Sequence, residues 1–169
     1  MIGRIPQHLQ QVFVRNLIFG VEDSLVSTVG LLAGIAVGDV PPHTILLTGV
    51  VYIAVEALSM AVGSFLSEES VTEMEEKRPG VSVAFWGALV MFASFIIAGF
   101  VPLAPYLLVG GGYALPASVI VSLVVLFGLG FAHGRMVKAN SWSRALRMML
   151  LGGGAILLGI GVSRLFGIA

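Results

Sequence analysis

Five long apolar runs restrict the folds open to this chain more than any other feature of its sequence. A helix needs about 20 apolar residues to cross a hydrocarbon core about 30 Å thick. The runs that meet this length cover residues 17–38, 44–66, 82–101, 114–133 and 146–168. With 57% hydrophobic and 11% charged residues, the chain is far from the composition of soluble domains. We expect an all-α integral membrane protein, with residues 1–169 forming a single domain of five transmembrane helices.

The third and fourth runs belong to one stretch, from Pro79 to Gly134, that contains no Asp, Glu, Lys or Arg. The segment PLAPYLLVGGGYALP lies inside this stretch and is rich in proline and glycine. Because proline removes a backbone donor and glycine is a poor helix former, we expect this segment to end the third helix near Val101 and form a hairpin.

Basic residues predict how the five helices are oriented. An odd number of spans puts the two termini on opposite sides of the membrane. Only Arg164 approaches the C-terminal side, and the other basic residues fall on the N-terminal side: Arg4, Arg15, Lys77, Arg78, Arg135, Lys138, Arg144 and Arg147. The positive-inside rule then predicts a cytoplasmic N-terminus and an external C-terminus, with residues 68–80 as a short cytoplasmic linker.

Composition also excludes several functions. Acidic and basic residues balance at nine each, so no basic excess points to nucleic acid, and the absence of cysteine rules out disulfides and thiolate metal sites. No Ser/His/Asp, Cys/His or phosphate-loop pattern is present. We therefore expect neither an enzyme nor a tightly bound cofactor.

Asp23 and Glu56 are carboxylates inside apolar runs. A charge there costs at least about 2.5 kcal/mol, so an acid kept in a span indicates a functional site. At 1.5 Å per residue, Asp23 lies ~12 Å from Arg15, and Glu56 lies ~18 Å from Thr44 on the opposite side. Met60 is one turn from Glu56. We expect all three side chains near the middle of the membrane, with Ser27 and Tyr52 on the same helix faces.

Each of these residues has a second interpretation. Asp23 could cap the N-terminus of the first span, which would leave a span shorter than the ~17 residues needed to cross. Glu56 could form a buried hydrogen bond to a neighbouring helix, and Met60 could be core packing. The role of Glu22, about 100° around the helix from Asp23, stays open between headgroups and a partner. We expect His8, His43 and His133 at membrane interfaces rather than on a metal.

Carboxylate oxygens combined with a thioether favour a borderline divalent metal such as Fe²⁺, Mn²⁺ or Zn²⁺. One chain offers three such ligands, whereas these cations take four to six. A two-fold homodimer doubles the set, and the small residues Gly30, Gly34 and Gly38 would let the first spans of two copies approach closely.

The linker after the second run is acidic. Glu69, Glu73 and Glu76 recur at i, i+4 and i+7, so a helical extension of the second span would carry them on one stripe. This stripe would concentrate cations at the mouth of a pathway, or it is a solvated helix end; both interpretations stay open.

The runs NLIFGVEDSLVSTVGLLAGIA and VEALSMAVGSFLS resemble the vacuolar iron transporter family. The segments ASFIIAGFVPLAPYLL, LFGLGFAHGR and LRMMLLGGGAILLGIGVSRLFG continue the resemblance through the remaining spans. It implies a five-span dimer whose metal path lies between the first and second spans of the two copies. It also implies export of Fe²⁺, often with Mn²⁺, from the cytosol in exchange for protons, with Asp23 and Met60 on the path.

The sequence departs from the family pattern in two places. The usual Asp-Gly is Asp23-Ser24 here. Many members carry a three-helix cytoplasmic metal-binding domain between the second and third spans, where this chain has only SEESVTEMEEKRPG. The alternative function is therefore a non-transporting membrane subunit that anchors a soluble iron-storage or iron-handling partner. We expect the chain in the cell (inner) membrane of a prokaryote.

Overall fold

Five long helices make up the part of the protein that the structure describes, and the prediction of an all-α membrane fold is confirmed. The computed structural model describes residues 7–38, 40–74, 81–109 and 111–166. Each of the five helices is long and apolar enough to cross a membrane. A short 3₁₀ turn, η1 (Gly111–Tyr113), precedes the fourth helix. The helices are α1 (Gln7–Val37), α2 (Pro42–Met74), α3 (Val81–Leu108), α4 (Ala114–Met136) and α5 (Ser141–Leu165).

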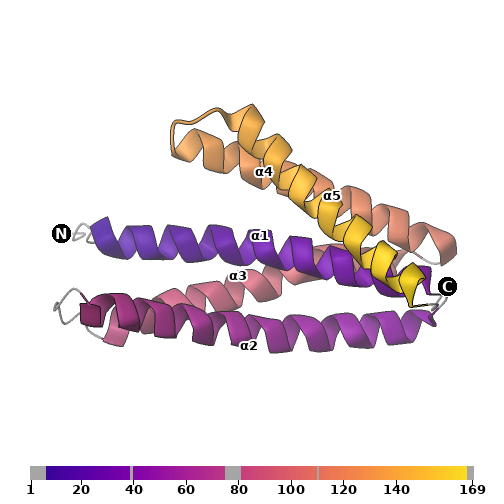
Figure 1. The fold of residues 1–169 in the computed structure, drawn as a ribbon, viewed down its shortest axis with the longest axis horizontal. Helices are drawn as coiled ribbons and strands as arrows, with labels where there is room; N and C mark the ends of the chain where they lie inside the picture. The colour runs from indigo at the N-terminus through magenta and orange to yellow at the C-terminus, as the bar shows by residue number, and fades with distance from the viewer. Residues whose placement is uncertain (1–6, 39, 75–80, 110, 167–169) are drawn as a thin grey trace.

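The helices form two groups, shown in Figure 1. Helices α1, α2 and α3 run side by side along the long axis, and the hairpin of α4 and α5 crosses them at an angle. The start of α1, the end of α2 and the turn between α4 and α5 lie at one end, which we call the basic end (Figure 1). Arg135 and Lys138 lie at this end, whereas Arg164 is in the last turn of α5 at the other. The one-sided charge pattern thus matches the fold, and the side that faces the cytoplasm stays a prediction.

Helix α3 is longer than predicted, and the expected break near Val101 is wrong. The helix continues through Pro102 and Pro105 to Leu108. Prolines are tolerated inside membrane helices when neighbouring helices and hydroxyl side chains bond to the freed backbone groups. Ser118 Oγ on α4 donates a hydrogen bond of 2.6 Å to the Pro102 carbonyl oxygen, which ties this part of α3 to α4. The hairpin therefore turns only at the glycines that follow Leu108.

The core is divided because α3 packs against both α1 and α2, while α1 also packs against α5. Fully buried side chains fill these contacts, among them Leu25 and Leu32 of α1 and Phe95 and Leu103 of α3. Helices α1 and α2 touch each other much less. Open space therefore remains along the line where α1 and α2 meet.

Close helix contact occurs between α1 and α5. A side-chain carbon added to Gly30 would lie 2.9 Å from the carbonyl oxygen of Ala155, and one added to Gly34 would lie 2.8 Å from that of Gly159. Only glycine permits backbones to approach this closely. The predicted use of Gly30 and Gly34 between the first spans of two copies is therefore wrong, because α5 of the same chain occupies that ridge.

Candidate functional site between α1 and α2

Asp23 lies in the interior of α1, sixteen positions after the helix begins at Gln7. The alternative interpretation of Asp23 as a helix cap is therefore excluded. Its side chain is partly buried and interacts electrostatically with Glu56 of α2. The structure thus brings together the two carboxylates that the sequence singled out, across the loosely packed contact of α1 and α2.

Ser24 fixes the rotation of α1 that directs Asp23 towards α2. The Ser24 side chain is fully buried, and its Oγ donates a hydrogen bond of 2.7 Å to the carbonyl oxygen of Phe95 on α3. The next residue, Leu25, is also fully buried in the core. Because successive helical residues are about 100° apart, holding Ser24 and Leu25 inward leaves Asp23 at the edge that faces α2. The serine that follows Asp23 therefore has a structural use that glycine could not supply.

Two further polar side chains complete the group around Asp23 and Glu56. The Tyr52 hydroxyl, one turn before Glu56, interacts with the Ser27 side chain and with both carboxylates. Ser27 Oγ donates a hydrogen bond of 2.6 Å to the backbone carbonyl oxygen of Asp23. Helical spacing had placed Ser27 and Tyr52 on these faces, but had not marked them as members of the site. Their contact with each other across the helices appears only in the structure.

Two pockets follow one face of α2; Glu56 lines the first of them, and Asp23 lines neither. A pocket of about 500 Å³ is lined by Glu56 and Tyr52, together with Thr48 of α2 and Leu31 of α1. A second pocket, of about 660 Å³, lies one turn nearer the basic end and is lined by Met60. Glu56 and Met60 are neighbours on the same helix face, so the two pockets follow one another along α2. They share no lining residue, and the arrangement is two separate hollows along one face of α2.

The pocket at Met60 also contains Asn16, Ser64 and Met91. Asn16 and Met91 are buried, and Ser64 Oγ donates a hydrogen bond of 2.9 Å to Asn16 Oδ1. The Asn16 Nδ2 atom is buried and has no hydrogen-bond partner. Met60 itself is partly buried and also packs against the apolar cluster of α2 and α3. Met60 thus borders both the pocket and the core.

The acidic stripe is only partly described. Helix α2 continues to Met74, and Glu69 and Glu73 are exposed on this extension. Glu76 lies outside the described residues. Glu68, in contrast, is buried and forms an ion pair with Arg15 on α1, in which Glu68 Oε2 lies 2.7 Å from Arg15 Nη2. Glu68 therefore connects the two helices near the basic end and does not share the exposed surface of Glu69 and Glu73.

One chain alone does not provide a closed metal site at Asp23 and Glu56. Within residues 7–38, 40–74, 81–109 and 111–166, no three His, Asp or Glu side chains gather closely enough to hold one ion. The pair instead offers two carboxylates beside a tyrosine hydroxyl, with a thioether one turn away. This set suits a borderline divalent cation, which would need further ligands from water or from a second copy.

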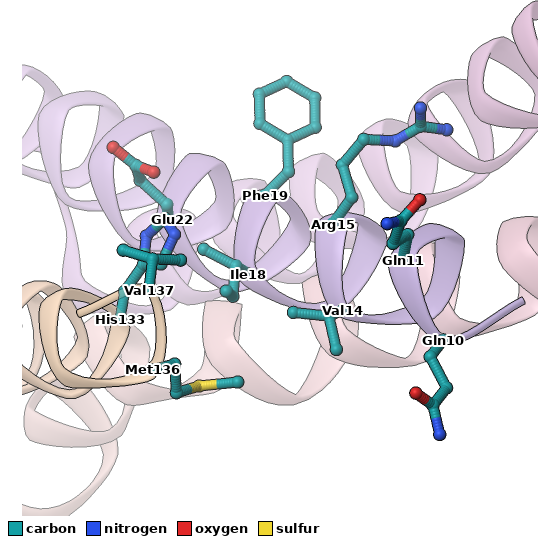
Figure 2. A pocket seen from close by; sticks show the side chains of 10 residues that line it. All are labelled: Gln10, Gln11, Val14, Arg15, Ile18, Phe19, Glu22, His133, Met136 and Val137. Carbon is teal, nitrogen blue, oxygen red and sulfur yellow. The ribbon is translucent and has the colours of Figure 1, made fainter. Parts of the chain in front are cut away.

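Glu22, whose role the sequence left open, faces a different helix. It lies in a pocket of about 750 Å³ between α1 and the end of α4, shown in Figure 2, and interacts electrostatically with His133. His43 is exposed near the start of α2. The structure therefore separates the adjacent acids, with Asp23 towards α2 and Glu22 towards α4.

Comparison with known proteins agrees with this architecture. The VIT family model matches residues 14–82 and 79–164. Vacuolar iron transporter homolog 2 from Oryza sativa subsp. japonica is 29% identical over 91% of this chain and 90% of its own length. Vacuolar iron transporter 1 from the same plant is 23% identical over 89% of this chain and 84% of its own length. Vacuolar iron transporter 1 from Arabidopsis thaliana is 23% identical over 82% of this chain and 80% of its own length. The two matched segments together span the five helices, and the chain belongs to the VIT family.

Proposed function

We propose that this chain transports divalent metal ions, with Fe²⁺ as its main cargo, out of the cytosol in exchange for protons. The observation that carries this proposal is the Asp23–Glu56 pair, which lies within membrane-spanning helices where α1 and α2 are loosely packed. Two carboxylates at such a position raise the free energy of inserting the helices into the membrane. Acidic residues that are kept there usually line an ion or proton pathway. The relatives compared here are named iron transporters, which favours iron over other metals and agrees with the expectation that the chain is not an enzyme.

Proton exchange follows from the closeness of the two acids. Two carboxylates that share a poorly solvated site cannot both stay charged without a compensating cation. When no metal is bound, we expect protons to neutralise the pair, and an arriving divalent ion to displace them. Tyr52 and Glu22 both interact with Asp23 and would modulate this exchange. Metal and protons would then move in opposite directions.

A homodimer would complete the coordination of the ion. One chain supplies Asp23, Glu56 and Met60, fewer than the four to six ligands that such cations take. The pockets at Glu56 and Met60 open on the surface between α1 and α2. A second copy facing this surface across a two-fold axis would supply the same ligands at the same depth. Since α5 covers the glycine ridge of α1, the dimer would meet through the α1–α2 edge rather than through that ridge.

Metal choice, orientation and membrane are further parts of the proposal. The oxygen and thioether ligands also suit Mn²⁺ and Zn²⁺. The basic end would face the cytoplasm, where Glu69, Glu73 and Glu76 would attract cations to the entrance. The word vacuolar in the relatives' names describes those plant proteins, so the inner membrane of a prokaryotic cell stays a prediction for this chain.

Reconstitution of the purified chain alone into liposomes tests the function. With an acidic lumen and anaerobic Fe²⁺ outside, we expect Fe²⁺ to accumulate inside and a protonophore to stop the accumulation. The alternative of a non-transporting subunit predicts no uptake without a soluble partner. If Fe²⁺ uptake does not depend on the pH gradient, the proposal of proton exchange is wrong and that of metal transport stands.

A further inference from the structure

A second set of metal-ligating side chains lies between α1 and α4, on another side of α1 from Asp23. The pocket that holds them is about 750 Å³ in volume and is formed by the first four turns of α1 and the last turn of α4. The hairpin of α4 and α5 diverges from α1 towards this end of the bundle (Figure 1). The polar and sulfur-containing lining residues are Gln10, Gln11, Arg15, Glu22, His133 and Met136.

Glu22 and His133 both line this pocket, from α1 and α4 respectively (Figure 2), and they interact electrostatically. The Nδ1 atom of His133 is buried and has no hydrogen-bond partner. Buried polar atoms in native proteins are almost always bonded, so an imidazole nitrogen without a partner is unusual and is consistent with a ligand on this ring. Met136 lies about one helical turn after His133 on α4 and adds a thioether to the same pocket.

We propose that Glu22 and His133, with Met136, bind a divalent metal ion at the basic end of the bundle, before it reaches Asp23 and Glu56. This inference rests on the proposed function, because it assigns the site to the transported cation. Carboxylate oxygen, imidazole nitrogen and thioether sulfur together suit Fe²⁺, Zn²⁺ or Co²⁺ better than Mg²⁺ or Ca²⁺. His133, which the sequence placed at an interface, would then be a ligand.

Charge at the pocket permits a cation. Arg15 also lines it, but its guanidinium points away from Glu22 and His133 (Figure 2). The Arg15 charge is balanced by Glu68 at 2.7 Å. With the Arg15 charge balanced at Glu68, Glu22 supplies a carboxylate and His133 a nitrogen donor in the same pocket. With at most three protein ligands, water would complete the coordination, and binding would be weaker than at a closed four-ligand site.

A site of this kind would serve capture and release. The linker 68–80 is too short to hold the separate metal-binding domain that many family members carry, so a first binding site for the ion would have to lie on the transmembrane helices. Because Glu22 and Asp23 are adjacent on α1, an ion that leaves the α1–α4 pocket would enter the α1–α2 site after a short movement around one helix. The ion would also join α4 to α1 at the end where the two helices diverge.

Co²⁺ binding to the full-length protein in detergent tests this proposal. The background is the double variant Asp23→Asn, Glu56→Gln, which removes the carboxylates of the α1–α2 site. Binding is followed by calorimetry and by histidine NMR, which is simple to assign because the sequence has three histidines. We expect Co²⁺ to perturb the His133 resonance, and Glu22→Gln or His133→Gln to weaken binding about tenfold or more, which corresponds to 1.4 kcal/mol or above.

His43→Gln is the matched control, because His43 is an exposed histidine far from the pocket in sequence and should leave Co²⁺ binding unchanged. Glu22→Gln keeps the size of the side chain, so gel filtration and thermal melting should show a folded protein. Co²⁺ binding that neither Glu22→Gln nor His133→Gln weakens would overturn the proposal. The measurement does not require transport, so a protein that binds Co²⁺ here but moves no metal would refute the proposed function and leave this site standing.

Discussion

Arg15 Nη2 on α1 lies 2.7 Å from Glu68 Oε2 on α2, and this ion pair joins two helices that otherwise touch little. It lies at the basic end of the pocket that contains Met60, and Arg15 itself lines that pocket. The pair therefore holds α1 and α2 together next to the entrance of the proposed path, while the contact around Asp23 and Glu56 stays open.

We predict a modest coupling energy between Arg15 and Glu68. The Arg15 side chain is 58% exposed and that of Glu68 is 5% exposed, so water screens one partner only. A double-mutant cycle of Arg15→Gln and Glu68→Gln, measured by equilibrium unfolding in detergent, should give about 1 kcal/mol. Arg147→Gln, at an exposed position of α5, is the control and should cost little. Additive effects of the two substitutions would show that the ion pair contributes nothing.

Gly159→Ala should destabilise the protein. A side-chain carbon at this position would collide with the carbonyl oxygen of Gly30, so α1 and α5 would have to separate. Overpacking of this kind costs about 1–3 kcal/mol. Gly154→Ala on the same helix is the matched control, because nothing lies within 4 Å of its added carbon. We expect a lower melting temperature in detergent for Gly159→Ala alone, and equal melting temperatures would argue against the close α1–α5 contact.

The acidic stripe should act on affinity rather than on maximal rate. We expect Glu69→Gln, Glu73→Gln and Glu76→Gln together to weaken apparent metal affinity in liposome transport and to leave maximal flux mostly intact. The reason is that exposed charges attract cations from solution and are screened within about 10 Å at moderate salt. Ser70→Ala, also exposed on α2, should have no effect. If the triple variant keeps normal affinity at low salt, the stripe is only a solvated helix end.

The orientation of the chain in the membrane can be measured by introducing single cysteines, because the sequence contains no cysteine of its own. Pro41 and Val71 are exposed at opposite ends of α2. An impermeant thiol reagent applied to intact cells should label a cysteine at 41 and spare one at 71. Both positions should react after the cells are opened, which controls for accessibility. The reverse pattern in intact cells would place the basic end outside.

The sequence predicted the number of helices and a similar depth for Asp23 and Glu56, because hydropathy and helical spacing are local properties. It did not predict that α3 continues past Pro102, since the hydroxyl of Ser118 that bonds this region is sixteen residues away. The same limit explains Gly30 and Gly34: their spacing indicates close packing, but only the fold shows that α5 is the neighbour.

The pocket at Glu22 shows why part of the candidate site could not be predicted from the sequence. Glu22 and His133 are separated by most of the chain, and no local pattern connects them. Glu68 directly precedes Glu69 of the acidic stripe, and nothing in the local sequence sets it apart. Its burial and its pairing with Arg15 follow from the way α1 lies against α2, which depends on contacts from α3 to both helices.

Fe²⁺ uptake by Asp23→Asn liposomes tests the central claim most directly. The substitution removes the charge and keeps the shape, so the protein should fold and insert normally, while uptake driven by an acidic lumen should fall to the rate of protein-free liposomes. Asp39→Asn, the same change at the only other aspartate of the sequence, is the control and should transport at the normal rate. Normal flux through Asp23→Asn would contradict a metal path at Asp23 and Glu56.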